Sequence, residues 1–247
     1  MGLGGLSFVV GVIGNVISVL MFLSPVSTFW RIIKRGSTEE FESLPYVCTL
    51  LNSSLWTYYG IAKPGELLVA TVNGFGILVE AIYLSIFLVY APKKMRVKTA
   101  ILLGILDVGF LAIAILATQL ALKGDDRTDA MGILGAGLNI MMYASPLAAM
   151  KTVVTTKSVE FMPFFLSFFF FLNGGVWAFY AILKKDLILG VPNGTGFILG
   201  SAQLVLYAMY SNAKASQNAL TDGLLEEGQQ NEHLIPPSDE IISQHQS

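Results

Sequence analysis

The chain has 247 residues, of which 54% are hydrophobic and 13% are charged, and its formal net charge is −2. Soluble domains carry about 25% charged residues, so the charge here is too sparse to cover a surface that faces water. The composition therefore indicates a multi-pass membrane protein. It also excludes a basic face for nucleic acid, because acidic residues outnumber basic ones.

Residue types suited to metal, redox or hydrolytic chemistry are nearly missing from the body of the chain. Cys48 is the single cysteine, and both histidines, His233 and His245, fall in the last fifteen residues. This excludes a disulfide framework and a cysteine zinc cluster. The sequence contains neither a P-loop nor a dinucleotide fingerprint nor a catalytic triad. We therefore expect no enzymatic activity, no metal and no cofactor.

Seven apolar segments approach the length of about 20 residues that a helix needs to cross a bilayer. They span residues 6–28, 44–62, 68–90, 98–122, 130–150, 162–183 and 187–211. The first has no basic n-region or cleavage site, so we interpret it as a retained span rather than a signal peptide.

The loops and the tail indicate the orientation. Ten lysines and arginines fall on one side of the predicted membrane and five on the other. By the positive-inside rule, the N-terminus is luminal or extracellular and the C-terminus is cytosolic. Residues 212–247 are rich in acidic side chains and lack aromatic ones, which predicts a disordered cytosolic tail.

An internal repeat relates the two halves of the body. Ser24-Pro25 recurs as Ser145-Pro146 and Trp56 as Trp177, all at an offset of 121, and Asn73-Gly74 recurs as Asn193-Gly194 at 120. We divide the chain into a first three-helix repeat (1–92), a linker helix with its loops (93–129) and a second three-helix repeat (130–211). The extra helix restores the direction of the chain, so the repeats are parallel. The predicted fold is therefore all-α, with seven transmembrane helices in a 3+1+3 arrangement.

Amides at equivalent positions of the repeats are the main candidates for substrate binding. Asn73 and Asn193 lie at membrane depth, where an unpaired amide is costly, and glycines flank both. The alternative is hydrogen bonding between closely packed helices. Two asparagines at equivalent positions favour a shared central cavity.

Further paired residues extend this candidate site. Asn52 lies four residues before Trp56, and Asn173 four before Trp177, so each amide shares a helix face with an indole. Indole faces and amides together suit a sugar, which offers C–H groups and hydroxyls. The remaining candidate pairs are Ser18 with Asn139 and the bulky, flexible Met21 with Met142.

Two acids and four prolines complete the candidates. Glu80 and Asp107 are the acids within the spans away from their ends; each serves either as a hydrogen-bond partner between helices or as a proton carrier. Prolines at the cytosolic ends of the repeat helices remove backbone donors and predict paired hinges at one gate. They are Pro25, Pro45, Pro146 and Pro163.

The chain resembles the plant SWEET sugar transporters of the MtN3/saliva family. The resemblance rests on Trp56-Thr57-Tyr58-Tyr59-Gly60, on Ser158-Val159-Glu160-Phe161-Met162-Pro163 and on Pro192-Asn193, together with the prolines. It implies the parallel 3+1+3 fold for which that family is known. It also implies a sugar pocket lined by both tryptophans with Asn73 and Asn193, a proline tetrad, and an outer gate closed by a hydrogen bond between Tyr59 and Asp186.

These observations predict bidirectional facilitated diffusion of a sugar by alternating access. Similarity to the vacuolar subgroup favours a hexose, fructose or glucose, and the vacuolar membrane over the plasma membrane. The expected partners are a monosaccharide and the lipid bilayer, with homo- or hetero-oligomers possible. The alternatives are a proton-coupled sugar carrier that uses Glu80 or Asp107, and a seven-helix receptor that transports nothing.

Overall fold

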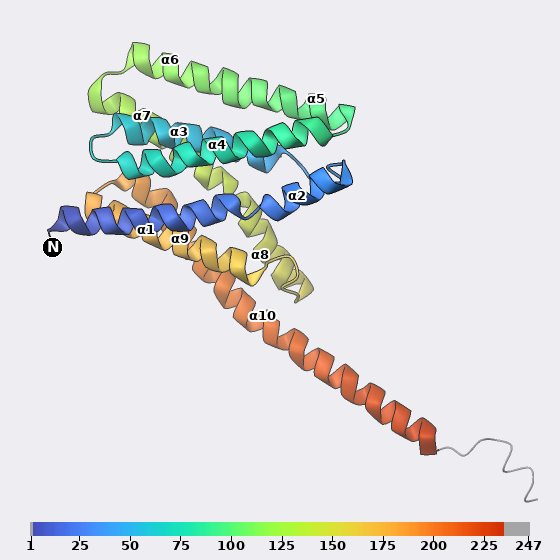
Figure 1. Cartoon of the computed structure of the whole chain (residues 1–247). Coiled ribbons are helices and arrows are strands. Elements are labelled where there is room, and N and C mark those ends of the chain that lie inside the picture. The colour runs from blue at the N-terminus through green and yellow to red at the C-terminus, as the bar shows by residue number, and fades with distance from the viewer. Residues whose placement is uncertain (1, 235–247) are drawn as a thin grey trace, which may run out of the picture.

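The computed structural model describes residues 2–234, and every regular element in that range is a helix (Figure 1). The first unit contains α1 (Leu3–Leu23), α2 (Val26–Arg35), α3 (Leu44–Ala62) and α4 (Leu67–Tyr90). The linker contains α5 (Lys93–Leu102), a π-helical stretch η1 (Leu103–Phe110) and α6 (Leu111–Ala121). The second unit contains α7 (Gly124–Met142), α8 (Ala144–Thr156), α9 (Phe164–Lys184) and α10 (Leu187–Leu234).

Within residues 2–234, six helical stretches are long and apolar enough to cross a membrane: Leu3–Arg35, Leu67–Tyr90, Lys93–Ala121, Gly124–Thr156, Phe164–Lys184 and Leu187–Ser211. The seventh predicted span, α3, has the bounds expected but is more polar, since it carries Asn52, Ser53 and Thr57. It is packed against α4, α7 and the linker, so much of its surface faces protein rather than lipid.

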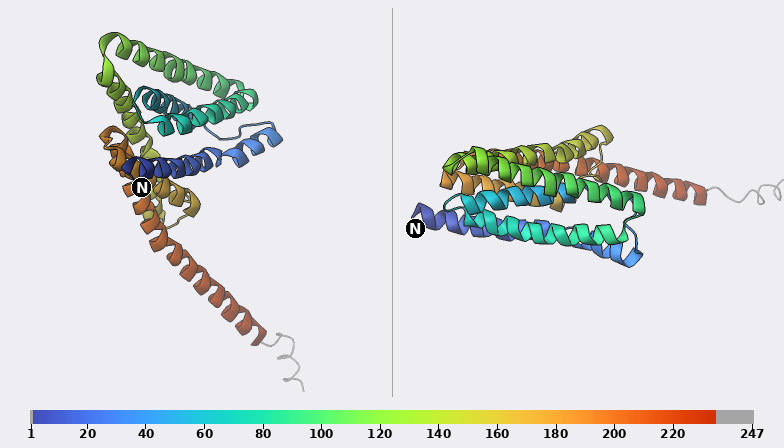
Figure 2. Two further views of the ribbon diagram at one scale, coloured as in Figure 1. Left: turned by 60° about the vertical axis from the view of Figure 1, so that its left-hand side comes forward. Right: turned by 90° about the horizontal axis from the view of Figure 1, so that it is seen from above.

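Each unit contacts the other through equivalent helices. In the first unit α1 packs against α9, and in the second α7 packs against α3. The turns α3–α4, α6–α7 and α9–α10 lie at the same end as the N-terminus, whereas α2 and α5 lie at the opposite end (Figures 1 and 2). We call these the N-terminal end and the proline end.

Close packing at the N-terminal end depends on glycines at equivalent positions. A Cβ atom on Gly14 would lie 2.9 Å from the Trp177 ring, and one on Gly135 would lie 3.2 Å from the Trp56 ring. The aromatic side chains of α9 and α3 therefore reach the backbones of α1 and α7. This packing brings the two units together around a central space.

The prolines act in two different ways. Pro25 separates α1 from α2, and the Met21 carbonyl that would have accepted its missing N–H accepts Ser24 N–H (3.1 Å) and Oγ–H (2.8 Å) instead. Pro146 lies three residues past the break at Tyr143, inside the helical stretch Gly124–Thr156 that runs from α7 into α8, so a backbone donor is missing within that stretch.

The expectation that all four prolines weaken a helix was wrong for the other two. Pro45 lies in the first turn of α3 and Pro163 directly precedes α9. The backbone N–H groups of a first helical turn have no partner within the helix, so a proline there removes no hydrogen bond.

The last helix is longer than expected. The sequence predicted disorder from residue 212, but α10 continues to Leu234. Residues 212–234 contain several alanines, leucines and glutamates and no proline, which favours helix. Residues 235–247, the rest of the predicted disordered tail, lie outside the described residues.

Candidate functional site

A cavity of about 490 Å³ lies between the two units. Small-molecule pockets range from about 300 to 1,000 Å³, so this volume suits a small ligand. All ten predicted substrate residues line it: Ser18, Met21, Asn52, Trp56, Asn73, Asn139, Met142, Asn173, Trp177 and Asn193. Of the prolines, Pro25, Pro45 and Pro146 line it, and Pro163 is not among the lining residues.

The cavity is closed at one end. At the N-terminal end, Tyr59 and Tyr180 are 0% and 1% exposed. Towards the proline end the lining continues to Ser24 and Pro45, both of which are exposed. The structure is therefore a state in which a ligand reaches the cavity from the proline end.

Asn73 and Asn193 have the same surroundings. Each amide donates one hydrogen bond of 2.8 Å to the carbonyl four residues earlier, at Val69 and Leu189 respectively. Both bonds stay within a helix, so among the described residues neither amide is seen to join two helices, which was the alternative considered from the sequence. The second N–H of each amide, and its oxygen, remain for a ligand in the cavity.

The second amide pair is held less symmetrically. Ser18 Oγ donates to Asn173 Oδ1 (2.6 Å) and accepts from Trp177 Nε1 (3.0 Å), which links α1 to α9. Asn52 Nδ2 donates to the Gly135 carbonyl (3.2 Å), which links α3 to α7. These bonds fix the amides and one indole at the cavity wall, where they can meet a polar ligand.

The two membrane acids are not hydrogen-bond partners between helices in the part of the chain that the structure describes, so that interpretation was wrong. Glu80 is 4% exposed and lines the cavity, and its Oε2 has no partner there. Both carboxylate oxygens of Asp107 are likewise buried and unpaired among the described residues. Sequence reasoning placed no acid in the cavity, although Glu80 lies seven residues after Asn73, on the same helix face.

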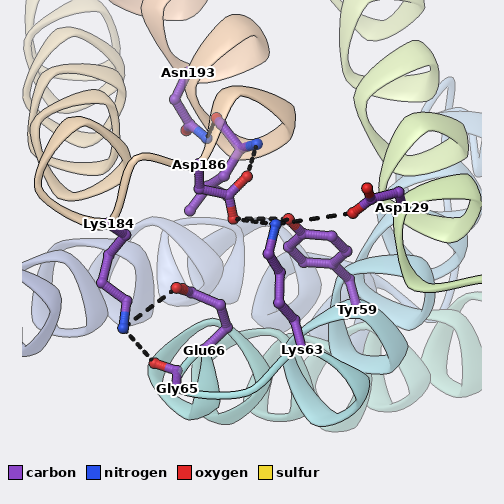
Figure 3. A network of polar contacts seen from close by, with 9 residues as sticks. Tyr59, Lys63, Gly65, Glu66, Asp129, Lys184, Asp186 and Asn193 are labelled. Carbon is purple, nitrogen blue, oxygen red and sulfur yellow. Dashed lines mark hydrogen bonds and ion pairs between the residues drawn. The ribbon is translucent and has the colours of Figure 1, made fainter. Parts of the chain in front are cut away.

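The gate contact implied by the family resemblance is present (Figure 3). Tyr59 Oη donates to Asp186 Oδ2 at 2.7 Å, and Lys63 Nζ lies 3.2 Å from the same oxygen. Lys63 also donates to Tyr59 Oη and lies 3.9 Å from Asp129 of α7. The other oxygen of Asp186 accepts the Leu189 N–H at 3.1 Å. First and second units are thus joined across the N-terminal end.

Four charged residues of this network were not among the sequence candidates: Lys63, Glu66, Asp129 and Lys184. Two of them, Lys63 and Glu66, fall in the α3–α4 turn, which sequence reasoning treated as a connection. The repeat offset was the available signal, since it relates Lys63 to Lys184 and Glu66 to Asp186.

Comparison with known proteins agrees with this fold and site. The family described as "Sugar efflux transporter for intercellular exchange" matches residues 8–95 and 129–215. The chain belongs to this family. It is a family of transporters rather than enzymes, and the all-helical membrane fold predicted from the sequence is confirmed.

Individual SWEET relatives match over most of their length. "Bidirectional sugar transporter SWEET17" of Arabidopsis thaliana is 61% identical over 92% of this chain and 93% of its own. SWEET16 of the same plant is 62% identical over 85% of this chain and 91% of its own. A solved eukaryotic SWEET transporter superposes with a TM-score of 0.81 at 42% identity, over 85% of this chain and all of that one.

Proposed function

We propose that this SWEET-family chain carries out bidirectional facilitated diffusion of a sugar across a membrane. The observation that carries the proposal is the cavity between the two units, lined by paired amides and indoles and closed at one end by the Tyr59–Asp186 contact. Opening the N-terminal end while the proline end closes would expose the same cavity to the other side. The relatives described as bidirectional sugar transporters support this mechanism.

The substrate we propose is a hexose, fructose or glucose. The side chains of Asn52, Asn173, Met21 and Met142 occupy the cavity wall and limit its width. Amide donors and acceptors beside indole rings suit a pyranose or furanose better than an ion or an apolar molecule. The resemblance to the vacuolar subgroup supports the vacuolar membrane as the location. The distribution of lysines and arginines in the loops supports an N-terminus in the lumen and a proline end in the cytosol.

A proton-coupled carrier is the second candidate, because Glu80 lines the cavity without a hydrogen-bond partner among the described residues. A labelled-hexose flux assay separates the two. In a cell that lacks its own hexose carriers, with the protein directed to the plasma membrane, we expect uptake that equilibrates and survives a protonophore. Concentrative uptake that the protonophore abolishes, and that Glu80→Gln also abolishes, would establish proton coupling instead.

A transport-inactive chain would support the receptor alternative.

Oligomer formation remains a prediction. Many large apolar side chains are exposed on the described helices, among them Phe165 and Leu116, and these face either lipid or another copy.

A further inference from the structure

The charged groups at the N-terminal end form two reciprocal ion pairs. Lys63 of the first unit lies 3.2 Å from Asp186 of the second, and Lys184 of the second lies 3.4 Å from Glu66 of the first (Figure 3). The repeat offsets relate the two lysines, at 121, and the two acids, at 120. Each unit thus gives its partner one cation and one anion, as a self-complementary two-fold interface does.

The aromatic surroundings of the second pair repeat those of the first. The Tyr180 and Trp177 rings pack in a T-shaped arrangement with centroids 5.3 Å apart. The Tyr59 and Trp56 rings pack in the same way at the same distance. Lys184 Nζ lies 5.9 Å from the Tyr180 ring centre, and Lys63 Nζ lies 4.8 Å from the Tyr59 ring centre. The second site therefore repeats the tryptophan, the tyrosine, the lysine and the carboxylate of the Tyr59 gate.

The two sites differ in how well the carboxylate is satisfied. Asp186 accepts hydrogen bonds from Tyr59 and from the Leu189 backbone in addition to its lysine. Glu66 is 3% exposed, and its Oε2 has no hydrogen-bond partner within the described residues. Lys184 is held in place by a 2.8 Å hydrogen bond to the Gly65 carbonyl. Among the described residues, Lys184 is therefore the one cation that pairs with Glu66.

We propose that Lys184 and Glu66 form a second clasp at the N-terminal end, so that the cavity opens there only when both reciprocal ion pairs separate. Lys184 acts as a positioning residue: it compensates the buried Glu66 charge in the closed state and touches no substrate. This inference rests on the proposed alternating-access function. Because removing one member of a buried pair costs more than removing both, loss of Lys184 alone destabilises the closed state most.

The distance between the two units at this end provides the test. Ile61 and Ile182 are equivalent positions on α3 and α9, and both are exposed (71% and 70%). Spin labels on Ile61→Cys and Ile182→Cys, in a Cys48→Ser background, report the unit separation by pulsed electron paramagnetic resonance in nanodiscs. In Lys184→Met we expect the ratio of the longer to the shorter distance to rise about tenfold.

Two further variants show whether Lys184 acts through Glu66. Adding Glu66→Gln to Lys184→Met should return the short distance, because no buried charge is then left unpaired. Lys185→Met is the matched control, since Lys185 is exposed and makes no ion pair with any residue that the structure describes. It should leave the distances unchanged.

An unchanged distance in Lys184→Met, or a change that Glu66→Gln does not reverse, would overturn the proposal. Lys184→Gln serves the same test if the methionine variant is not recovered as a folded protein. Hexose flux through the labelled protein is measured separately. If the spin-label distances change as predicted but the protein transports no sugar, the proposed function is contradicted and the clasp is not.

Discussion

The Tyr59 hydroxyl donates a 2.7 Å hydrogen bond to the Asp186 carboxylate, and this bond joins the first unit to the second at the closed end of the cavity. Both side chains are buried. A hydrogen bond to a carboxylate away from water is stronger than one between neutral groups. Opening of the N-terminal end must break this bond, so it contributes directly to the balance between the two access states.

Replacing Tyr59 with phenylalanine should therefore shift that balance towards the open state. The ring still packs against Trp56, and only the hydroxyl is lost. A hydrogen bond to a charged group contributes about 1.5–3 kcal/mol, so we expect the open-to-closed ratio to rise about tenfold or more. The spin-label distance between positions 61 and 182 measures it. Tyr58→Phe is the control, because the Tyr58 hydroxyl bonds Gln119 outside the gate (2.9 Å). Identical distances in Tyr59→Phe and wild type would contradict the gate assignment.

Acidification should favour the closed N-terminal end, because protonation of Glu66 removes a buried charge that Lys184 compensates only in part. Burial raises the pKa of Glu66 above its ordinary value of 4.5, and nearby Asp186 raises it further, whereas Lys184 and the Tyr180 hydroxyl lower it. Opening exposes the carboxylate and returns its pKa towards 4.5. The closed state then binds the proton more tightly, so its population rises as the pH falls from the raised pKa towards 4.5.

The same spin-label pair measures this pH dependence. Glu66→Gln cannot take up the proton, so its distance distribution should depend less on pH across that window. A shift towards the open state on acidification, or an equal pH response in Glu66→Gln, would disprove the assignment of the titrating group.

Loss of either central amide should reduce sugar flux. In Asn73→Ala or Asn193→Ala, a sugar hydroxyl loses its partner at an enclosed site, which costs about 1 kcal/mol or more, or about fivefold in flux. Labelled-hexose uptake, normalised to the protein present in the membrane, measures the effect. Thr195→Ala is the control, since the Thr195 hydroxyl bonds Val191 in its own helix (2.9 Å). Near-normal uptake by both asparagine variants would rule out these amides as sugar ligands.

The prolines should fall into two classes. Pro25→Ala and Pro146→Ala restore a backbone donor inside the interrupted helical stretches Leu3–Arg35 and Gly124–Thr156, so we expect stiffer helices and slower sugar exchange. Pro45→Ala and Pro163→Ala lie at helix starts, where that N–H has no helical partner, and should exchange at nearly the wild-type rate. Counterflow rates of the four variants test this, and equal rates in all of them would exclude the hinge role.

The width of the cavity should set the size of the sugar. Asn52 and Asn173 both line the cavity, one from each unit, so shortening both side chains adds space at two places in its wall. We expect Asn52→Ser combined with Asn173→Ser to admit some sucrose and to bind hexose less well. Parallel uptake of labelled sucrose and hexose measures this. Wild-type transport of sucrose as fast as hexose would show that these amides do not limit size.

Much of this arrangement could be predicted from the sequence because the repeat constrains it twice. Apolar length located the spans, and α3 begins and ends where it was expected, at Leu44 and Ala62. The offset then paired residues whose separate signals are weak, such as Ser18 with Asn139. Pairing alone brought ten residues to one cavity, since equivalent positions of two parallel units face the same central axis.

What the sequence did not reveal depends on packing and on helix continuity. Whether a proline interrupts a helix or begins one is decided by the turn before it, which separates Pro25 from Pro45. Nothing in the composition of residues 103–110 distinguishes π-helix from α-helix. Lys184 ends α9 and Glu66 directly precedes α4, positions at which a charged side chain ordinarily faces water. Only the close approach of the two units buries Glu66.

Counterflow of labelled hexose in proteoliposomes tests the central claim most directly. Purified protein is reconstituted with no ion gradient and with unlabelled hexose on one side, and label is added to either side in turn. Facilitated diffusion predicts transient accumulation of label in both directions, unaffected by a protonophore and lost in the Asn73→Ala, Asn193→Ala double variant. Counterflow in neither direction, or only with an imposed proton gradient, would contradict it.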